Sequence, residues 1–314
     1  MTARARDLPL SALLAEQRRS HGSGRLLENL GDGYLYRENP FFRRIRVAAR
    51  RRSIRFTLTD PGDYFAFPLV ALDTVLRTRQ VPYRANYSAL CAFDRSRPGF
   101  FTLADLRLNR PLPNYILHES AHAVAFHELF GRPDDVSAAL SNPKKIVHVL
   151  LGEAYAMTAE YLAACAVDGV LHDWFFSINS YRHRTPAKKA IGEFIAEIGL
   201  PLVTWLLLIA FLENNFFVER LSVSVLDRAL AAFPGPRAPR LTPTTRARLA
   251  RALSSLMVMD PEFRENTARL FLTMHGYSRN IRRILRDDPL TLLEADSALP
   301  PALERLIAIL CDDH

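Results

Sequence analysis

The segment that most constrains the fold is the apolar run from Ile198 to Leu212, which lies between Glu197 and Glu213. It has fifteen residues and no charge, whereas a helix that spans a membrane needs roughly twenty apolar positions. We therefore predict a buried core helix here rather than a membrane segment. A chain of 314 residues can bury such a helix in one large domain, or in a catalytic core with a smaller lobe attached.

Turn-forming residues divide the chain into a mixed first part and a helical remainder. Residues 1–110 alternate short apolar runs with glycine, proline and aspartate, and this predicts a few strands with a helix near 68–79. Beyond that part the pattern is helical, and we predict helices over Asn114–Phe130, from about Asn142 to Val167, and over Ala187–Val218 with an interruption at Gly199-Leu-Pro201. The predicted fold class is α+β and mainly α-helical.

Three regions follow from this pattern. We predict a mixed N-terminal region over residues 1–110, a helical core over residues 111–233 and a helical C-terminal lobe over residues 244–314. The linker between the last two is residues 234–243, where four prolines in ten residues prevent a continuous helix.

An arginine-rich segment over residues 43–55 carries most of the chain's net charge. It holds seven arginines and no acidic residue, and without those charges the net charge of +8 would be +1. We interpret it as a solvated face of a helix or strand, since neither a nucleic-acid motif nor an aromatic stacking pattern accompanies it. A phosphate, a membrane surface and an acidic protein remain possible partners for Arg43–Arg55.

The cysteines and the N-terminus indicate a reducing compartment. Cys91, Cys165 and Cys311 are far apart and in no CxxC pattern, which favours ordinary thiols over a disulfide framework. The apolar run that follows the basic N-terminus is short and contains Pro9, unlike a signal peptide. We therefore expect a cytoplasmic protein.

The segment His118-Glu-Ser-Ala-His122 is the strongest chemical motif in the chain. Residues four apart lie on one face of a helix, so His118 and His122 can direct their imidazoles to a single metal ion. Glu119 is turned aside by about 100 degrees and is placed to act as a neighbouring base. Apolar residues flank the motif on both sides, although two histidines satisfied by core hydrogen bonds remain an alternative.

A third ligand is expected from the next helix. Glu153 and Glu160 are seven residues apart and therefore share a helix face that is otherwise apolar and rich in small residues. Such a face would let the two helices approach closely, so that Glu153 reaches the metal and Glu160 orients a ligand from behind. The reverse assignment of these two glutamates remains open.

These residues carry a family resemblance that covers about residues 114–165. The motif at His118–His122, followed by Leu151-Gly-Glu-Ala-Tyr-Ala-Met-Thr-Ala-Glu160-Tyr, resembles the zinc signature of the gluzincin metallopeptidases. The resemblance implies a zincin-like core with His118, His122 and Glu153 as zinc ligands. It also implies Glu119 as general base and Glu160 as a supporting residue.

That interpretation predicts zinc-dependent hydrolysis of a peptide or protein substrate. A zinc ion would lower the pKa of a bound water, and Glu119 would accept its proton. The oxyanion formed in the reaction needs a stabilising group, for which Tyr181 and His183 are the candidates in the next downstream cluster.

Two other interpretations stay open. Two histidines and a carboxylate also form the iron site of non-haem oxygenases, and Leu150-Leu-Gly-Glu-Ala-Tyr-Ala156 is similar to a stretch found in some peptide-modifying hydroxylases, so Fe²⁺ is the alternative cofactor. Glu119-Ser-Ala-His122 would also suit a di-iron bundle, but a second Glu-x-x-His element is missing from the sequence. A helical interaction protein with a chance motif is the non-catalytic alternative.

Overall fold

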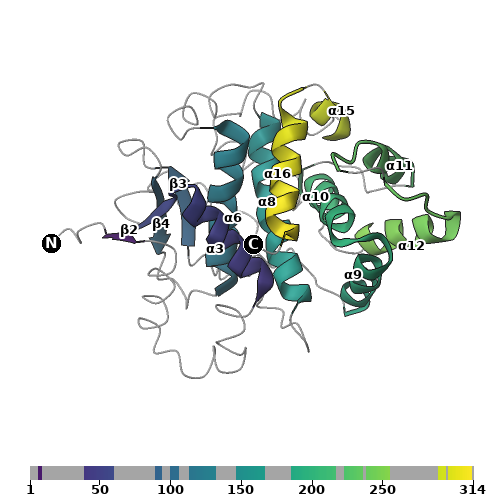
Figure 1. Ribbon diagram of the computed structural model, residues 1–314, viewed down its shortest axis with the longest axis horizontal. Coiled ribbons are helices and arrows are strands. Elements are labelled where there is room, and N and C mark those ends of the chain that lie inside the picture. The colour runs from purple at the N-terminus through teal and green to yellow at the C-terminus, as the bar shows by residue number, and fades with distance from the viewer. Residues whose placement is uncertain are drawn as a thin grey trace, which may run out of the picture.

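The structure is a computed structural model that describes residues 6–8, 39–59, 89–93, 100–105, 113–131, 146–166, 185–216, 223–235, 238–254, 289–294 and 296–312 (Figure 1). Helix predominates among these residues, which confirms the mainly helical part of the predicted fold class. The helix expected near residues 68–79 lies outside the described residues. The division into three regions stays a prediction.

The described helices and strands follow one another in a simple order. The helices are α3 (Pro40–Arg51), α6 (Pro113–Phe130), α8 (Ile146–Cys165), α9 (Thr185–Ile198), α10 (Leu200–Phe216), α11 (Val223–Ala231), α12 (Pro243–Ser254), α15 (Pro289–Glu294) and α16 (Leu299–Cys311). The strands are β1 (Arg6–Leu8), β2 (Arg55–Thr59), β3 (Ala89–Phe93) and β4 (Phe100–Asp105).

The four strands form one sheet in the order β1-β2-β4-β3. β2 and β4 are parallel, with Thr57 opposite Thr102, whereas β1 and β3 pair antiparallel with β2 and β4 respectively. β3 therefore lies at one edge of the described sheet, and it is the strand that packs against α6. The sheet and helices α9 to α12 lie on opposite sides of α6 and α8 (Figure 1).

Helix α10 forms the apolar centre of the helical part. Its residues from Leu202 to Glu213 are all buried, so the prediction of a buried core helix is confirmed. Gly199 adopts a positive φ of 88° between α9 and α10, a conformation that glycine tolerates best, and this confirms the predicted interruption. No helix among the described residues is both long and apolar enough to cross a membrane.

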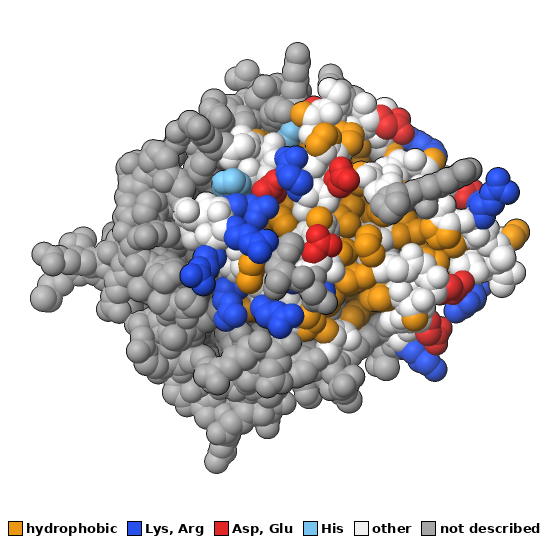
Figure 2. Space-filling view, viewed as in Figure 1, with side chains coloured by type: hydrophobic (Ala, Val, Ile, Leu, Met, Phe, Trp, Pro, Cys, Tyr) orange, Lys and Arg blue, Asp and Glu red, His pale blue; other side chains and the backbone are white. Residues whose placement is uncertain are grey.

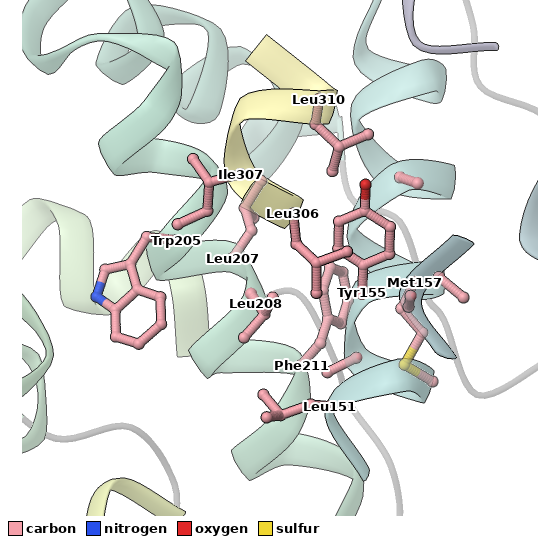
Figure 3. Packing of buried hydrophobic residues seen from close by; sticks show 14 of the residues in the cluster. Leu151, Tyr155, Met157, Trp205, Leu207, Leu208, Phe211, Leu306, Ile307 and Leu310 are labelled. Carbon is pink, nitrogen blue, oxygen red and sulfur yellow. The ribbon is translucent and has the colours of Figure 1, made fainter. Parts of the chain in front are cut away.

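The core joins α8, α10 and α16. Tyr155 of α8, Leu208 and Phe211 of α10 and Leu306 of α16 point toward one another in Figure 3, and all four are buried. Burying a large apolar side chain stabilises a fold by roughly 1.5–3 kcal/mol. α16 also packs against α3 and α6, so it shares the core through which the helix of the histidine motif passes.

Two polar side chains fix α3 against this core. Asn39 caps α3, since its side-chain oxygen accepts hydrogen bonds from Phe41 and Phe42, and its amide donates to the carbonyl of Ala163 in α8 over 2.8 Å. At the other end, Arg52 donates from Nε to Glu128 Oε1 of α6 over 2.5 Å.

Glu128 also receives a second arginine from α16. Arg305 Nε donates to Glu128 Oε2 over 2.6 Å, so one carboxylate joins α3, α6 and α16. Burial alone would raise the pKa of Glu128, but its neighbours His127, Arg305 and Arg52 outweigh that effect and lower the pKa to about 2. The carboxylate is therefore ionised in the folded protein at neutral and mildly acidic pH.

Replacing Glu128 by Gln should lower the free energy of unfolding by about 2 kcal/mol near neutral pH, because Arg52 and Arg305 lose their shared charge. The pKa of Glu128 in the folded protein, about 2, lies below its ordinary value of 4.5. Its contribution is therefore fully present above about pH 4.5 and is lost as the pH falls toward about 2. Urea unfolding of wild type and Glu128→Gln at about pH 6 and about pH 3 measures this loss. The difference in unfolding free energy between the two proteins should be smaller at about pH 3.

The matched control is Glu193→Gln, because Glu193 pairs with Arg248 over 3.3 Å and both side chains are about half exposed. That exposed pair should contribute no more than about 0.5 kcal/mol. Equal destabilisation by the two substitutions would contradict the joining role of Glu128.

Candidate metal centre

Helix α6 carries the histidine motif through the hydrophobic core. Leu117, Ala121 and Ala125 on this helix are buried, and the predicted span of the helix is confirmed at Pro113–Phe130. The backbone places residues 118 and 122 one helical turn apart, as the motif requires. The side chains of His118 and Glu119 lie outside the described part of the structure.

The structure brings His122 and Glu153 together. Nε2 of His122 on α6 lies 2.7 Å from Oε2 of Glu153 on α8, within hydrogen-bond distance. The two residues are 7% and 9% exposed, so the contact is nearly removed from solvent. Two of the three predicted metal ligands thus meet across the interface of two helices, although thirty residues separate them in sequence.

A glycine and a phenylalanine make this close approach possible. Gly152 of α8 faces the ring of Phe126, and a Cβ atom at position 152 would lie 2.6 Å from Phe126 Cε1. Phe126 in turn stacks on the imidazole of His122, with ring centroids 5.5 Å apart and an angle of 28° between the planes. The phenyl ring therefore holds one side of His122 while Glu153 contacts its nitrogen.

Glu160 is buried more deeply than Glu153, at 1% exposure, but lies farther along the helix. Seven residues correspond to about 10.5 Å along a helix axis, so the two carboxylates cannot both lie beside His122 unless a long side chain folds back. The geometry favours Glu153 as the carboxylate of this centre. The low exposure of Glu160 is unusual for a glutamate and is consistent with a supporting role for this residue.

Two other described histidines, His127 and His148, make contacts of their own away from Glu153. His127 is near Glu128, with Nδ1 3.8 Å from Oε1, and belongs to the contact that joins α3, α6 and α16. His148 packs against Phe130 at 5.3 Å between ring centroids, and its Nε2 lies 3.6 Å from Asp296 Oδ2. Tyr181 and His183, the predicted oxyanion stabilisers, lie outside the described residues.

The chemistry of the His122 and Glu153 donors suits a divalent metal. Imidazole nitrogen and carboxylate oxygen are both common zinc ligands, and two ligands of one tetrahedral zinc ion lie about 3.3 Å apart. The observed 2.7 Å contact would need to open only slightly to accommodate an ion. Among the described side chains no cluster of three metal-binding groups is present, and the predicted third ligand, His118, is not one of those side chains.

Phe126 and Gly152 are the residues of this centre that sequence analysis missed. Phe126 lies four residues after His122, and this spacing alone places its ring on the histidine side of α6. Gly152 directly precedes Glu153 within a long predicted helix, where glycine is costly without a packing reason. Both signals were present in the sequence, but neither identifies the contact without the neighbouring helix.

Replacing Gly152 by Ala should destabilise the protein by about 1–3 kcal/mol, because the new Cβ would collide with the Phe126 ring in a closely packed interface. The control is Gly192→Ala on α9, where a Cβ atom would meet no atom within 4 Å. That exposed helical position should be neutral or gain up to about 1 kcal/mol in stability. Thermal unfolding of the two variants measures the difference, and equal effects would contradict the close contact.

Comparison with known proteins identifies no family for this chain. No protein-family model, no curated protein and no solved structure matches the chain. The interpretation of the centre therefore depends on the motif and on the contact between α6 and α8.

Proposed function

We propose that the protein is a metal-dependent hydrolase, with zinc as the metal and a peptide or peptide-like bond as the target. The observation that carries the proposal is the 2.7 Å contact between His122 Nε2 and Glu153 Oε2. It joins the second histidine of an HExxH motif to the carboxylate that the gluzincin resemblance assigns to the metal. In this proposal His118, His122 and Glu153 are the ligands.

The surroundings of the contact support a preorganised centre. Phe126 stacks on His122, and both side chains are nearly buried, so the imidazole has little freedom to rotate. Rigid, partly dehydrated ligands favour metal binding because little ordering is needed when the ion enters. Glu160, buried on the same helix, is proposed to support the ligands from behind.

Zinc bound by these residues would make a water molecule acidic enough to react near neutral pH. Glu119 would be the base that takes a proton from the attacking water and the acid that returns it to the leaving group. Glu119 follows His118 directly on α6, and helical spacing turns it about 100 degrees away from the histidines, which supports the role of a base rather than a ligand. Tyr181 or His183 is proposed to stabilise the negative charge that develops on the substrate oxygen.

The edge strand β3 supports a peptide as the substrate. Within the described sheet β3 is paired on one side only, and it packs against α6. An edge strand offers backbone N–H and C=O groups that an extended peptide can pair with. An extended substrate along β3 would lie next to the helix that carries the histidines, as in a zincin-like core.

Elemental analysis tests the metal. Wild-type protein should contain about one zinc per chain, and His118→Ala, His122→Ala and Glu153→Ala should each lose it because a three-ligand site rarely survives the loss of one ligand. His127→Ala is the matched control and should keep the metal, since His127 lies near Glu128 instead. Bound iron in place of zinc would indicate a non-haem iron oxygenase. A protein that binds no metal even after reconstitution would contradict the proposed metal-dependent hydrolase.

The roles of the two acids can be separated by substitution. Glu119→Gln should keep stoichiometric zinc and lower the hydrolysis of a peptide library by about 100-fold or more, as expected of a general base. Glu160→Ala should weaken zinc binding by less than Glu153→Ala does, because it removes support rather than a ligand. Loss of zinc from Glu119→Gln would refute the role of Glu119 as a base that is not a ligand. Loss of zinc from Glu160→Ala but not from Glu153→Ala would show that Glu160 is the ligand and Glu153 the supporting residue.

A further inference from the structure

Helix α3 presents a stripe of arginines away from the core. Arg46, Arg50 and Arg51 are partly or fully exposed, and they surround the partly exposed Val47. The opposite side of α3 is buried through Phe42, Ile45 and other residues. The helix contains no acidic residue. We call Arg46, Arg50 and Arg51, together with Val47, the arginine face.

The arginine face differs from two other arginines of the segment, Arg44 and Arg52. Arg44 is buried and donates to the Leu310 carbonyl over 2.6 Å, and Arg52 pairs with Glu128. By contrast, Arg46, Arg50 and Arg51 form no ion pair with any residue that the structure describes. Within the described part of the chain, no acidic side chain therefore neutralises these three charges.

An apolar surface continues from this face. The bond from Arg44 to Leu310 places the end of α16 against α3, and Thr204 Oγ1 lies 3.5 Å from Cys311 Sγ, which places the start of α10 beside the end of α16. Leu200 and Pro201 at the start of α10 are partly or fully exposed. Figure 2 shows basic side chains gathered over α3 and, beside them on the same face, a broad apolar area that also holds a few acidic side chains.

We propose that this face binds an anionic lipid surface. Lipid headgroups supply phosphate for the arginines, and the boundary of the acyl chains can accept the apolar side chains beside them. Stable attachment to a membrane surface generally needs such a pair of signals, one electrostatic and one apolar. A nucleic acid would use only the arginines, and the aromatic residues of α3, Phe41 and Phe42, are buried and unable to stack on bases.

Vesicle co-sedimentation tests the proposal directly. Wild-type protein should bind vesicles of phosphatidylcholine that contain phosphatidylglycerol and should bind pure phosphatidylcholine far more weakly. Arg46→Gln combined with Arg50→Gln should weaken binding to the anionic vesicles by about 30-fold, since each basic residue near such a surface contributes about a fivefold increase in affinity. Raised salt should weaken the wild type as well.

Two matched variants distinguish binding through the arginine face from a general effect of the protein's net charge. Arg240→Gln combined with Arg251→Gln removes the same charge from two exposed arginines of the α12 region and should keep most of the binding. Arg46→Lys combined with Arg50→Lys should also bind, because a lipid surface responds to charge more than to guanidinium geometry. Circular dichroism melts of each variant check that the exposed substitutions leave the fold intact.

Three outcomes would overturn the proposal. Equal binding of wild type to neutral and anionic vesicles would exclude an electrostatic lipid contact. Equal loss in the α3 and α12 variants would show that net charge, not the arginine face, governs binding. Tighter binding to duplex or single-stranded DNA than to vesicles at equal phosphate concentration would identify a nucleic acid as the partner.

Discussion

The close packing of α6 on α8 is the constraint on which the candidate centre depends. Gly152 lets the Phe126 ring lie against α8, and the same ring stacks on His122. Without that approach His122 and Glu153, on separate helices, would not meet at 2.7 Å. The packing also explains why polar groups are tolerated in a largely apolar interface, since each buried polar atom needs a partner at close range.

The helices around this pair are held by charge as well as by apolar contact. Glu128, six residues after His122 on α6, joins α3 and α16 through Arg52 and Arg305. Burial alone would raise the pKa of this carboxylate, and the neighbouring His127, Arg305 and Arg52 together outweigh that effect. The low pKa of Glu128 reflects this balance. The contacts of Glu128 with Arg52 and Arg305 thereby hold the part of α6 that follows the histidine motif.

The sequence predicted those features that depend on local pattern. The uncharged run up to Leu212 predicted the buried α10, and Gly199 with Pro201 predicted the break before it. The features it did not predict depend on contacts between distant residues. Nothing local indicates that Phe126 meets Gly152, or that Glu128 binds arginines 76 and 177 residues away. Helical spacing fixes the face of a residue but not the partner that covers it.

The arginine segment illustrates the same limit. Its seven arginines look alike in the sequence, yet helix geometry divides those of α3 and its C-cap by direction. Arg50 and Arg52 are two residues apart and therefore point about 200 degrees from one another on a helix. Arg52 thus turns inward to Glu128, while Arg50 faces outward. Arg44 and Arg52 are thus engaged within the fold, whereas Arg46, Arg50 and Arg51 share one side of α3, where they can act on the same surface.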